Sequence, residues 1–370
     1  MKISKVSIVA IFLLFAIMSP IHGQAYEADT VLGFFNSDDI GAYASYIGSD
    51  AAHLFAAFEA SLQASLLDQL SASTPSEAVF EHGYSGESSR NLGPHLVEAP
   101  WTLGKSGSSY GLTISSLRFR RFDGEPLNNI FDEAAGTGWS DFSLNAQIAR
   151  LQWNYGLTDE LDVGIQVPFI RLHGEGMFAT MRGMSRRGPW SRTDVGLGDA
   201  SWHSKYRLYG DRFRSTETTL SVGADLRFPT GNDDLLLGTG TFGGRVYSTL
   251  GKRVGPFYPC LQVGYHWKKI PVREKIKGVS TGLDSNDFDT FEVKAELPTT
   301  TLNGKLLLSP GFYCHKSNFD TKTGVSIAAH WLLAYSYRGS CTAQFGVDVP
   351  LGNHGLAPDI IPSVGIKLMF

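Results

Sequence analysis

Apolar and polar residues alternate with a period of two from about Tyr110 to the end of the chain. Between Leu161 and Phe169, every odd-numbered residue is apolar, whereas the even positions include Asp162 and Gln166. The same alternation recurs over 200–208, 220–228, 291–297, 325–335 and 343–349. Successive side chains of a strand point to opposite faces. The pattern therefore predicts long strands with one apolar and one polar face.

Strand spacing distinguishes a membrane barrel from a soluble sandwich or a lipocalin-like barrel. Twelve strands are predicted, near 109–121, 141–156, 160–172, 195–209, 217–229, 240–251, 256–268, 287–297, 302–315, 323–337, 340–349 and 361–370. The connections between them are alternately long and short, as expected when external loops are long and periplasmic turns are short. The even number of strands predicts that both ends of the barrel lie at the periplasmic rim.

The two faces support the same interpretation. The polar face carries many charged side chains, which could not form a dry core because unpaired buried charges are costly. In a bilayer the apolar face must point outward, and the polar face then lines a wet or internally paired lumen. The outward aromatic residues suit interfacial girdles: Trp153, Tyr155, Trp202, Tyr206, Phe228, Tyr265, Trp267, Trp331 and Tyr335. The predicted fold class is an all-β transmembrane antiparallel β-barrel of about twelve strands in the outer membrane of a Gram-negative bacterium.

The last strand also indicates an outer-membrane barrel. Val364, Ile366, Leu368 and Phe370 share one face, and the chain ends on the aromatic residue. Outer-membrane barrels tend to end in this way. We expect Phe370 to be an assembly signal for the barrel-assembly machinery and its strand to pair with the first strand near Tyr110.

The region before the barrel has a different pattern. Residues 1–25 combine two lysines, an apolar run and a small-residue site, which is typical of a signal peptide. Within 26–92, apolar residues between Ile47 and Leu70 recur at spacings of mostly four, which predicts an amphipathic helix or a pair of helices. A polar linker, Ser71–Arg90, follows it. We expect this segment to plug the pore or to lie in the periplasm, and the barrel to occupy 93–370.

Composition excludes several classes of function. The net charge of −4 argues against nucleic-acid binding. Cys260, Cys314 and Cys341 are too widely spaced for a disulfide framework or a metal site, although one bridge is possible in the periplasm. No cofactor or metal is expected. The predicted partners are outer-membrane lipids, the barrel-assembly machinery and a small-molecule permeant.

Three segments resemble a known family. They are Gly196–Ala200 (GLGDA), Leu226–Gly231 (LRFPTG) with Leu237–Gly240 (LGTG), and Ala99–Lys105 (APWTLGK). Together they resemble the outer-membrane family labelled as the MetA pathway of phenol degradation, over about 95–370. The resemblance implies a transport-related barrel, with small aromatic or hydrophobic compounds as cargo. This family also resembles the exporter of functional-amyloid subunits, which implies a helical plug or a trimer.

The candidate pore-lining residues are charged or polar and face the predicted lumen. They are Asp199, His203, Lys205, Arg207, Asp225, Arg227, Glu292, Lys294 and Glu296. These side chains could neutralise one another across strands or form a constriction that selects permeants by charge. A basic loop is predicted over 171–193, with Arg182, Arg186, Arg187 and Arg192, which could hold anionic lipopolysaccharide or an anionic solute.

Three function classes remain open. A channel for small hydrophobic or aromatic molecules is favoured, and a secretion channel for an amyloid-like polypeptide, gated by the helix, is the alternative. His315, Ser317 and Asn318 resemble a fragment of outer-membrane lipid hydrolases, which makes hydrolysis the minor alternative. Strand parity places His315 in the lumen, away from lipid. His203 and His266 are not expected to bind a metal, because no second His or Cys lies at ligand spacing from them in the sequence. The chain is therefore not expected to be an enzyme.

Overall fold

The computed structural model describes Leu62 and residues 96–370. Short gaps fall at 123, 128–139, 180–186, 211–217, 233–234, 236, 256, 268–274, 277–278, 281–288, 302–304, 320–321, 338–340 and 353–355. Predictions for the signal peptide at 1–25 and for a helix and linker within 26–92 lie outside the described residues, apart from Leu62.

The described chain is built almost entirely of strands, because the period-two pattern continues through it. Their bounds are β1 (Ser108–Phe122), β2 (Glu125–Pro126), β3 (Ser140–Gly156), β4 (Leu161–Ala179), β5 (Arg187–Leu197), β6 (Ser201–Tyr209), β7 (Thr218–Arg227), β8 (Gly243–Lys252), β9 (Cys260–Trp267), β10 (Lys275–Ile276), β11 (Val279–Ser280), β12 (Thr290–Glu296), β13 (Thr299–Thr301), β14 (Leu306–Phe319), β15 (Lys322–Tyr337), β16 (Cys341–Pro350), β17 (Leu356–Pro358) and β18 (Ile361–Met369).

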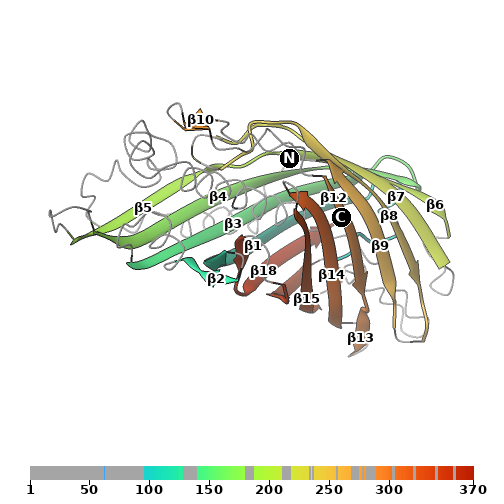
Figure 1. The fold of residues 1–370 in the computed structure, drawn as a ribbon. Coiled ribbons are helices and arrows are strands. Elements are labelled where there is room, and N and C mark those ends of the chain that lie inside the picture. Colours follow the sequence, from blue (N-terminus) through green and yellow to red (C-terminus); the bar gives the residue numbers. More distant parts are fainter. Residues whose placement is uncertain are drawn as a thin grey trace.

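Twelve of these strands form a closed antiparallel barrel (Figure 1). Along the wall the order is β1, β3, β4, β6, β7, β8, β9, β12, β14, β15, β16 and β18. Pairing of β12 with β14 and of β18 with β1 closes the circle. The predicted barrel of about twelve strands is confirmed. In the part of the chain that the structure describes, no helix is long and apolar enough to cross a membrane.

The first and last strands meet as predicted. Tyr110 is opposite Leu368, and Ser108 and Phe370 exchange two backbone hydrogen bonds of 3.1 and 2.9 Å. The Phe370 ring is exposed and meets Tyr110 edge-on, with the ring centroids 5.9 Å apart. We call the rim that carries Ser108 and Phe370 the terminal rim and the other one the distal rim.

Connections at the two rims differ in length. The terminal rim carries 157–160, 210–217, 253–259, 297–305 and 338–340, and the distal rim carries 123–139, 180–186, 228–242, 268–289, 320–321 and 351–360. Most of the predicted alternation of long and short connections is therefore present. The β14–β15 hairpin is the exception at the distal rim, because its strands continue to within two residues of each other.

One predicted loop and one predicted strand need correction. The basic loop expected over 171–193 is largely a hairpin, since β4 continues to Ala179 and β5 begins at Arg187. The strand expected over 195–209 is broken at 198–200, so that β5 and β6 pair with successive parts of β4. The reason is physical: an extended pairing satisfies the backbone of both segments, whereas polar composition alone had suggested a loop.

The faces of the barrel have the predicted orientation. Outward side chains such as Trp153, Tyr206 and Trp331 are 39 to 60% exposed, whereas inward Lys294 and Arg245 are at most 3% exposed. The inward face is polar and charged around Arg245 but apolar toward the distal rim, where Leu117, Phe119 and Leu144 are buried. The outward face is mainly apolar.

A short segment ahead of β1 occupies the lumen, which sequence patterns did not predict. Residues 96–103 are buried without exception, and Glu98 is 3% exposed. We call residues 96–105 the lumen strap. Its position inside the barrel makes it the element around which the candidate site is built.

Candidate functional site in the barrel lumen

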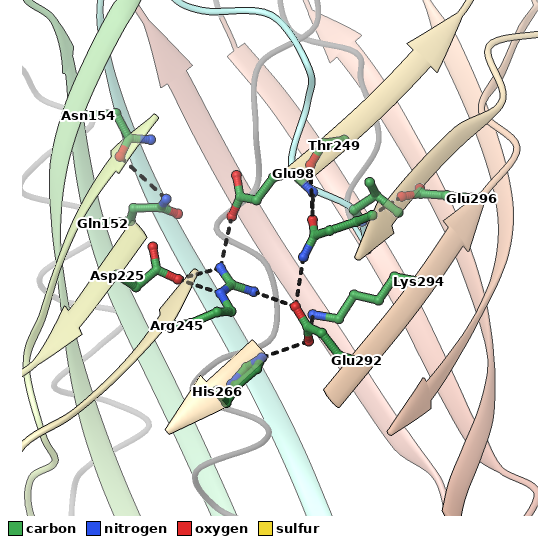
Figure 2. A network of polar contacts seen from close by, with 12 residues as sticks. Glu98, Gln152, Asn154, Asp225, Arg245, Thr249, His266, Glu292, Lys294 and Glu296 are labelled. Atoms are coloured by element: carbon green, nitrogen blue, oxygen red, sulfur yellow. Dashed lines mark hydrogen bonds and ion pairs between the residues drawn. The ribbon is translucent and has the colours of Figure 1, made fainter. Parts of the chain in front are cut away.

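Arg245 on β8 is the centre of a charged network inside the barrel (Figure 2). It lies opposite Asp225 of β7, and its Nε and Nη2 lie 2.6 and 2.5 Å from Asp225 Oδ2. Its Nη1 is 3.4 Å from Glu292 Oε1, and its Nη2 is 3.6 Å from Glu98 Oε1. A guanidinium presents several donors in a fixed plane. One side chain therefore joins two wall strands to the lumen strap.

Glu292 on β12 is the second centre of the network, and its side chain is fully buried. Lys294 Nζ lies 3.0 Å and His266 Nε2 2.9 Å from its Oε2, and Gln262 Nε2 donates to its Oε1 at 2.9 Å. His315 Nε2 is 4.0 Å away. A buried carboxylate is tolerated only with such partners, because desolvation is costly. The network holds its charges in fixed positions.

The lumen strap is tied to the wall at both of its ends. The backbone N–H groups of Leu96 and Val97 donate to Glu296 Oε2 at 2.7 and 3.1 Å. At the other end, Leu103 N donates to both carboxylate oxygens of Asp162, at 3.0 and 2.9 Å. Glu296 ends β12 and Asp162 is the second residue of β4, so both anchors lie toward the terminal rim. The strap therefore crosses this end of the lumen from β12 to β4.

Apolar contacts reinforce the strap between its anchors. Trp101 meets Tyr258 edge-on with the ring centroids 4.8 Å apart. Both belong to a buried cluster of Val97, Ala99, Trp101, Tyr258, Cys260, Leu307, Leu332 and Ala334. Burial of apolar surface stabilises such contacts by roughly 25 cal/mol per Å². The segment APWTLGK therefore contributes Ala99 and Trp101 to the apolar filling of this end of the lumen.

The structure brings some of the predicted pore-lining residues together and separates others. Asp225, Glu292 and Lys294 belong to the charged network, and Glu296 anchors the strap. Lys205 is 3.7 Å from Asp162, and Arg207 pairs with Glu160 beside the terminal rim. Arg227 lies 3.7 Å from Asp199. His203 is buried opposite Gly164, where a Cβ at residue 164 would lie 2.2 Å from the imidazole ring.

Asp199 has a structural position in the wall. It lies at the break between β5 and β6, where Oδ1 accepts from Gly231 N at 3.0 Å. Its Oδ2 accepts from the Thr239 backbone and hydroxyl at 2.9 and 2.6 Å. Gly238 approaches so closely that a Cβ there would lie 2.6 Å from the carboxylate. The GLGD and PTG…LGTG motifs therefore form one unit, in which the loop after β7 is fastened to the break in the wall.

A second polar group lies on β15 and β16, outside the charged network. His330 Nδ1 is 2.5 Å from Asp348 Oδ1, and its ring is 7% exposed. On the neighbouring wall, Gln344 Nε2 donates to Thr113 Oγ1 and Arg150 Nη2 to Ser115 Oγ. The lumen is therefore polar on more than one side.

The described residues do not form a metal site, since no three His, Cys, Asp or Glu side chains are suitably grouped among them. Cys260, Cys314 and Cys341 are free thiols, so the possible disulfide is not formed. His315 faces inward, as strand parity predicted, and lies next to Glu292 instead of lipid.

Sequence patterns missed the contact of Glu98 with Arg245, which joins the strap to the charged network. Glu98 lies ahead of the first strand, in a segment without alternation, and no pattern placed it inside the barrel. Its partner Arg245 could be assigned to the inner face by parity, but not to the centre of a network. The available signal was an acidic residue directly before the apolar Ala99–Pro100–Trp101.

No protein family matches the chain, and no curated protein sequence matches it. Among solved structures, it is similar to the COG4313 outer membrane channel from Pseudomonas putida F1, with 14% identity and a TM-score of 0.52 over 75% of this chain and 100% of that chain. The NanC porin has 10% identity and a TM-score of 0.43, covering 70% of this chain and 98% of that one. The CymD monoaromatic hydrocarbon channel has 9% identity and a TM-score of 0.39, covering 72% and 89%.

The first likeness shows the fold. Its closed twelve-stranded barrel has the architecture of that outer membrane channel.

Proposed function

We propose that this barrel is a channel for small molecules, and that its permeants are hydrophobic or aromatic. The observation that carries the proposal is the lumen strap, which is tied to β4 and β12 beside a fixed charged network. A barrel of this size leaves little interior space, and the strap reduces it further. Such a lumen is suited to small solutes.

The chemical class of the permeant rests on the family resemblance. The GLGD, PTG…LGTG and APWTLGK segments support membership of the family labelled as the MetA pathway of phenol degradation. The solved COG4313 protein, which resembles this chain in fold, is an outer membrane channel. The charged network would act as the constriction that a permeant must pass.

Export of an amyloid-like polypeptide is less well supported. A polypeptide could pass only if the strap left the lumen, which would break its bonds to Glu296, Gln262 and Asp162. Plugging or gating by the region 26–92 and assembly into a trimer stay predictions.

Uptake by whole cells would test the proposal. The protein would be expressed in a Gram-negative host that lacks its general porins, and entry of a radiolabelled monoaromatic compound would be followed over seconds. We expect faster entry than in cells that carry the empty vector. The variant Arg245→Gln, which alters the constriction, should change the rate per folded barrel. Heat-modifiable migration on gels gives the folded amount, because loss of Arg245 also destabilises the barrel. Equal entry with and without the barrel would refute the proposal.

A further inference from the structure

A basic patch lies on the lipid-facing surface of the barrel near the distal rim. On β1 the outward positions change from Tyr110, Leu112 and Ile114 to Ser116 and Arg118. On β4 they change from Phe169 to Arg171. The two arginines therefore lie directly beyond the apolar band, on the outside of the barrel.

The register of three strands brings this patch together. Arg118 is opposite Asn145 of β3, and Gln147 of the same strand is opposite Arg171 of β4. With strands about 4.8 Å apart and a rise of about 3.4 Å per residue, the Cα atoms of the two arginines are about 12 Å apart. Flexible side chains can converge over that distance, and the two amide side chains lie between them. The patch has a guanidinium group at each end and two amide side chains between them. His173, which is opposite Asn145, adjoins the patch and lies 3.7 Å from Glu175, two residues farther along β4.

These four side chains are not used elsewhere in the protein. Within the described residues, none of the four forms an ion pair or a side-chain hydrogen bond with another described residue. Arg118 is exposed, as is Gln147. The neighbouring Arg120 differs, because its guanidinium lies 3.3 Å from Asp359. Intramolecular pairing therefore does not explain the patch.

The height of the patch matches the outer membrane–water interface. Arg118 is eight residues from Tyr110 at the terminal rim, which is about 27 Å along the strand. With a strand tilt of 35–45°, this corresponds to about 20 Å across a band roughly 25 Å tall, before the length of the side chain is added. The distal rim carries most of the long connections, which are external in outer-membrane barrels. At that level the surrounding lipid presents its head groups.

We propose that Arg118, Asn145, Gln147 and Arg171 form a binding site for the phosphate groups of lipopolysaccharide. Guanidinium groups bind phosphate oxygens through short, charge-assisted and often bidentate hydrogen bonds. The amides of Asn145 and Gln147 provide further donors to the same oxygens. The acyl chains of the lipid would lie along the apolar outward residues of β1 and β3 below the patch. This inference is independent of what the lumen conducts.

The test measures lipid binding to the full chain by native mass spectrometry in detergent. The probes are diphosphoryl lipid A and the same lipid with both phosphates removed. We expect the wild-type protein to retain diphosphoryl lipid A at least about tenfold better, which corresponds to about 1.4 kcal/mol. Arg118→Gln combined with Arg171→Gln should remove this preference, whereas Arg118→Lys combined with Arg171→Lys should keep most of it.

Lys316→Gln is the matched control. Lys316 is an exposed, outward cation near the distal rim on β14, away from the patch, so its loss should leave binding unchanged. Heat-modifiable migration on gels shows that each variant is folded, and the two single arginine variants replace the double variant if it does not fold. The proposal is overturned if phosphate removal has no effect, if the folded glutamine variants bind like the wild type, or if Lys316→Gln lowers binding equally.

Discussion

Replacement of Glu296 by glutamine should release one end of the lumen strap. Glu296 Oε2 accepts the backbone N–H groups of both Leu96 and Val97, and its Oε1 accepts the Ser309 hydroxyl. In Glu296→Gln, the charge disappears, and the amide oxygen can stay on the strap only if the NH₂ group turns to the Ser309 hydroxyl, which then accepts. The side chain is 3% exposed, so water cannot readily compensate for the lost charge. Other contacts of the strap remain.

The magnitude follows from the weakening of these two bonds. A hydrogen bond to a charged group contributes about 1.5–3 kcal/mol and a neutral one about 0.5–1.5 kcal/mol. Conversion of the two strap bonds to neutral ones, at about 1 kcal/mol each, therefore costs about 2 kcal/mol. Since 1.4 kcal/mol is a factor of ten in an equilibrium constant, the fraction of time that the strap end is detached should rise about thirtyfold.

Single-channel recording in planar bilayers is the assay. We expect Glu296→Gln to show frequent openings of larger conductance than the wild-type protein. Glu160→Gln is the matched control, because Glu160 is an exposed carboxylate near the terminal rim, 3.9 Å from Arg207 and outside the strap. If folded Glu296→Gln opens no more often than Glu160→Gln, the idea that this carboxylate holds the strap is refuted.

Three further predictions concern stability. Arg245→Met should lower the free energy of unfolding in urea titrations by about 3–5 kcal/mol, because it leaves buried carboxylates uncompensated. A decrease of less than about 1 kcal/mol would contradict the role assigned to Arg245. Asp199→Asn should loosen the loop after β7, because the Asp199 carboxylate accepts three hydrogen bonds from that loop. Limited proteolysis should then cleave the loop at a site that resists cleavage in the wild type. An unchanged digestion pattern would count against this role of Asp199. Gly223→Ala should lower the free energy of unfolding by about 1–3 kcal/mol through overpacking, because its Cβ would lie 2.2 Å from Tyr247. Gly111→Ala should lower it less, because the nearest contact of its Cβ lies at 3.6 Å. Equal costs for the two substitutions would refute the packing argument.

Alternation of side chains made the wall of the barrel predictable. A single face must contact lipid along each strand, so a one-residue shift would place charges in the membrane. The orientation of Trp331 and Lys294, the seam between Tyr110 and Leu368, and the inward direction of His315 all follow from this constraint.

The contents of the lumen were not predictable in the same way. Whether Glu292 meets Lys294, Arg245 or His266 depends on strand tilt and side-chain length, which parity does not encode. The strap was not predictable, because its backbone is bound by side chains such as that of Asp162 instead of by a neighbouring strand. The break at 198–200 was not predictable, because it is stabilised by a hydrogen bond from the Thr239 backbone to the Asp199 carboxylate, and these residues are distant in sequence.

The strap also has a mechanical consequence for the barrel. Its anchors, β4 and β12, are separated by β6, β7, β8 and β9 on one side and by the remaining six strands on the other. It is therefore a cross-brace that joins nearly opposite points of the wall. A hydrogen-bonded cylinder bends easily between strands, but a tie across its diameter resists flattening or widening in that direction. While the strap is in place, the cross-section at the terminal rim has one preferred shape, and its release would free the wall itself to change shape.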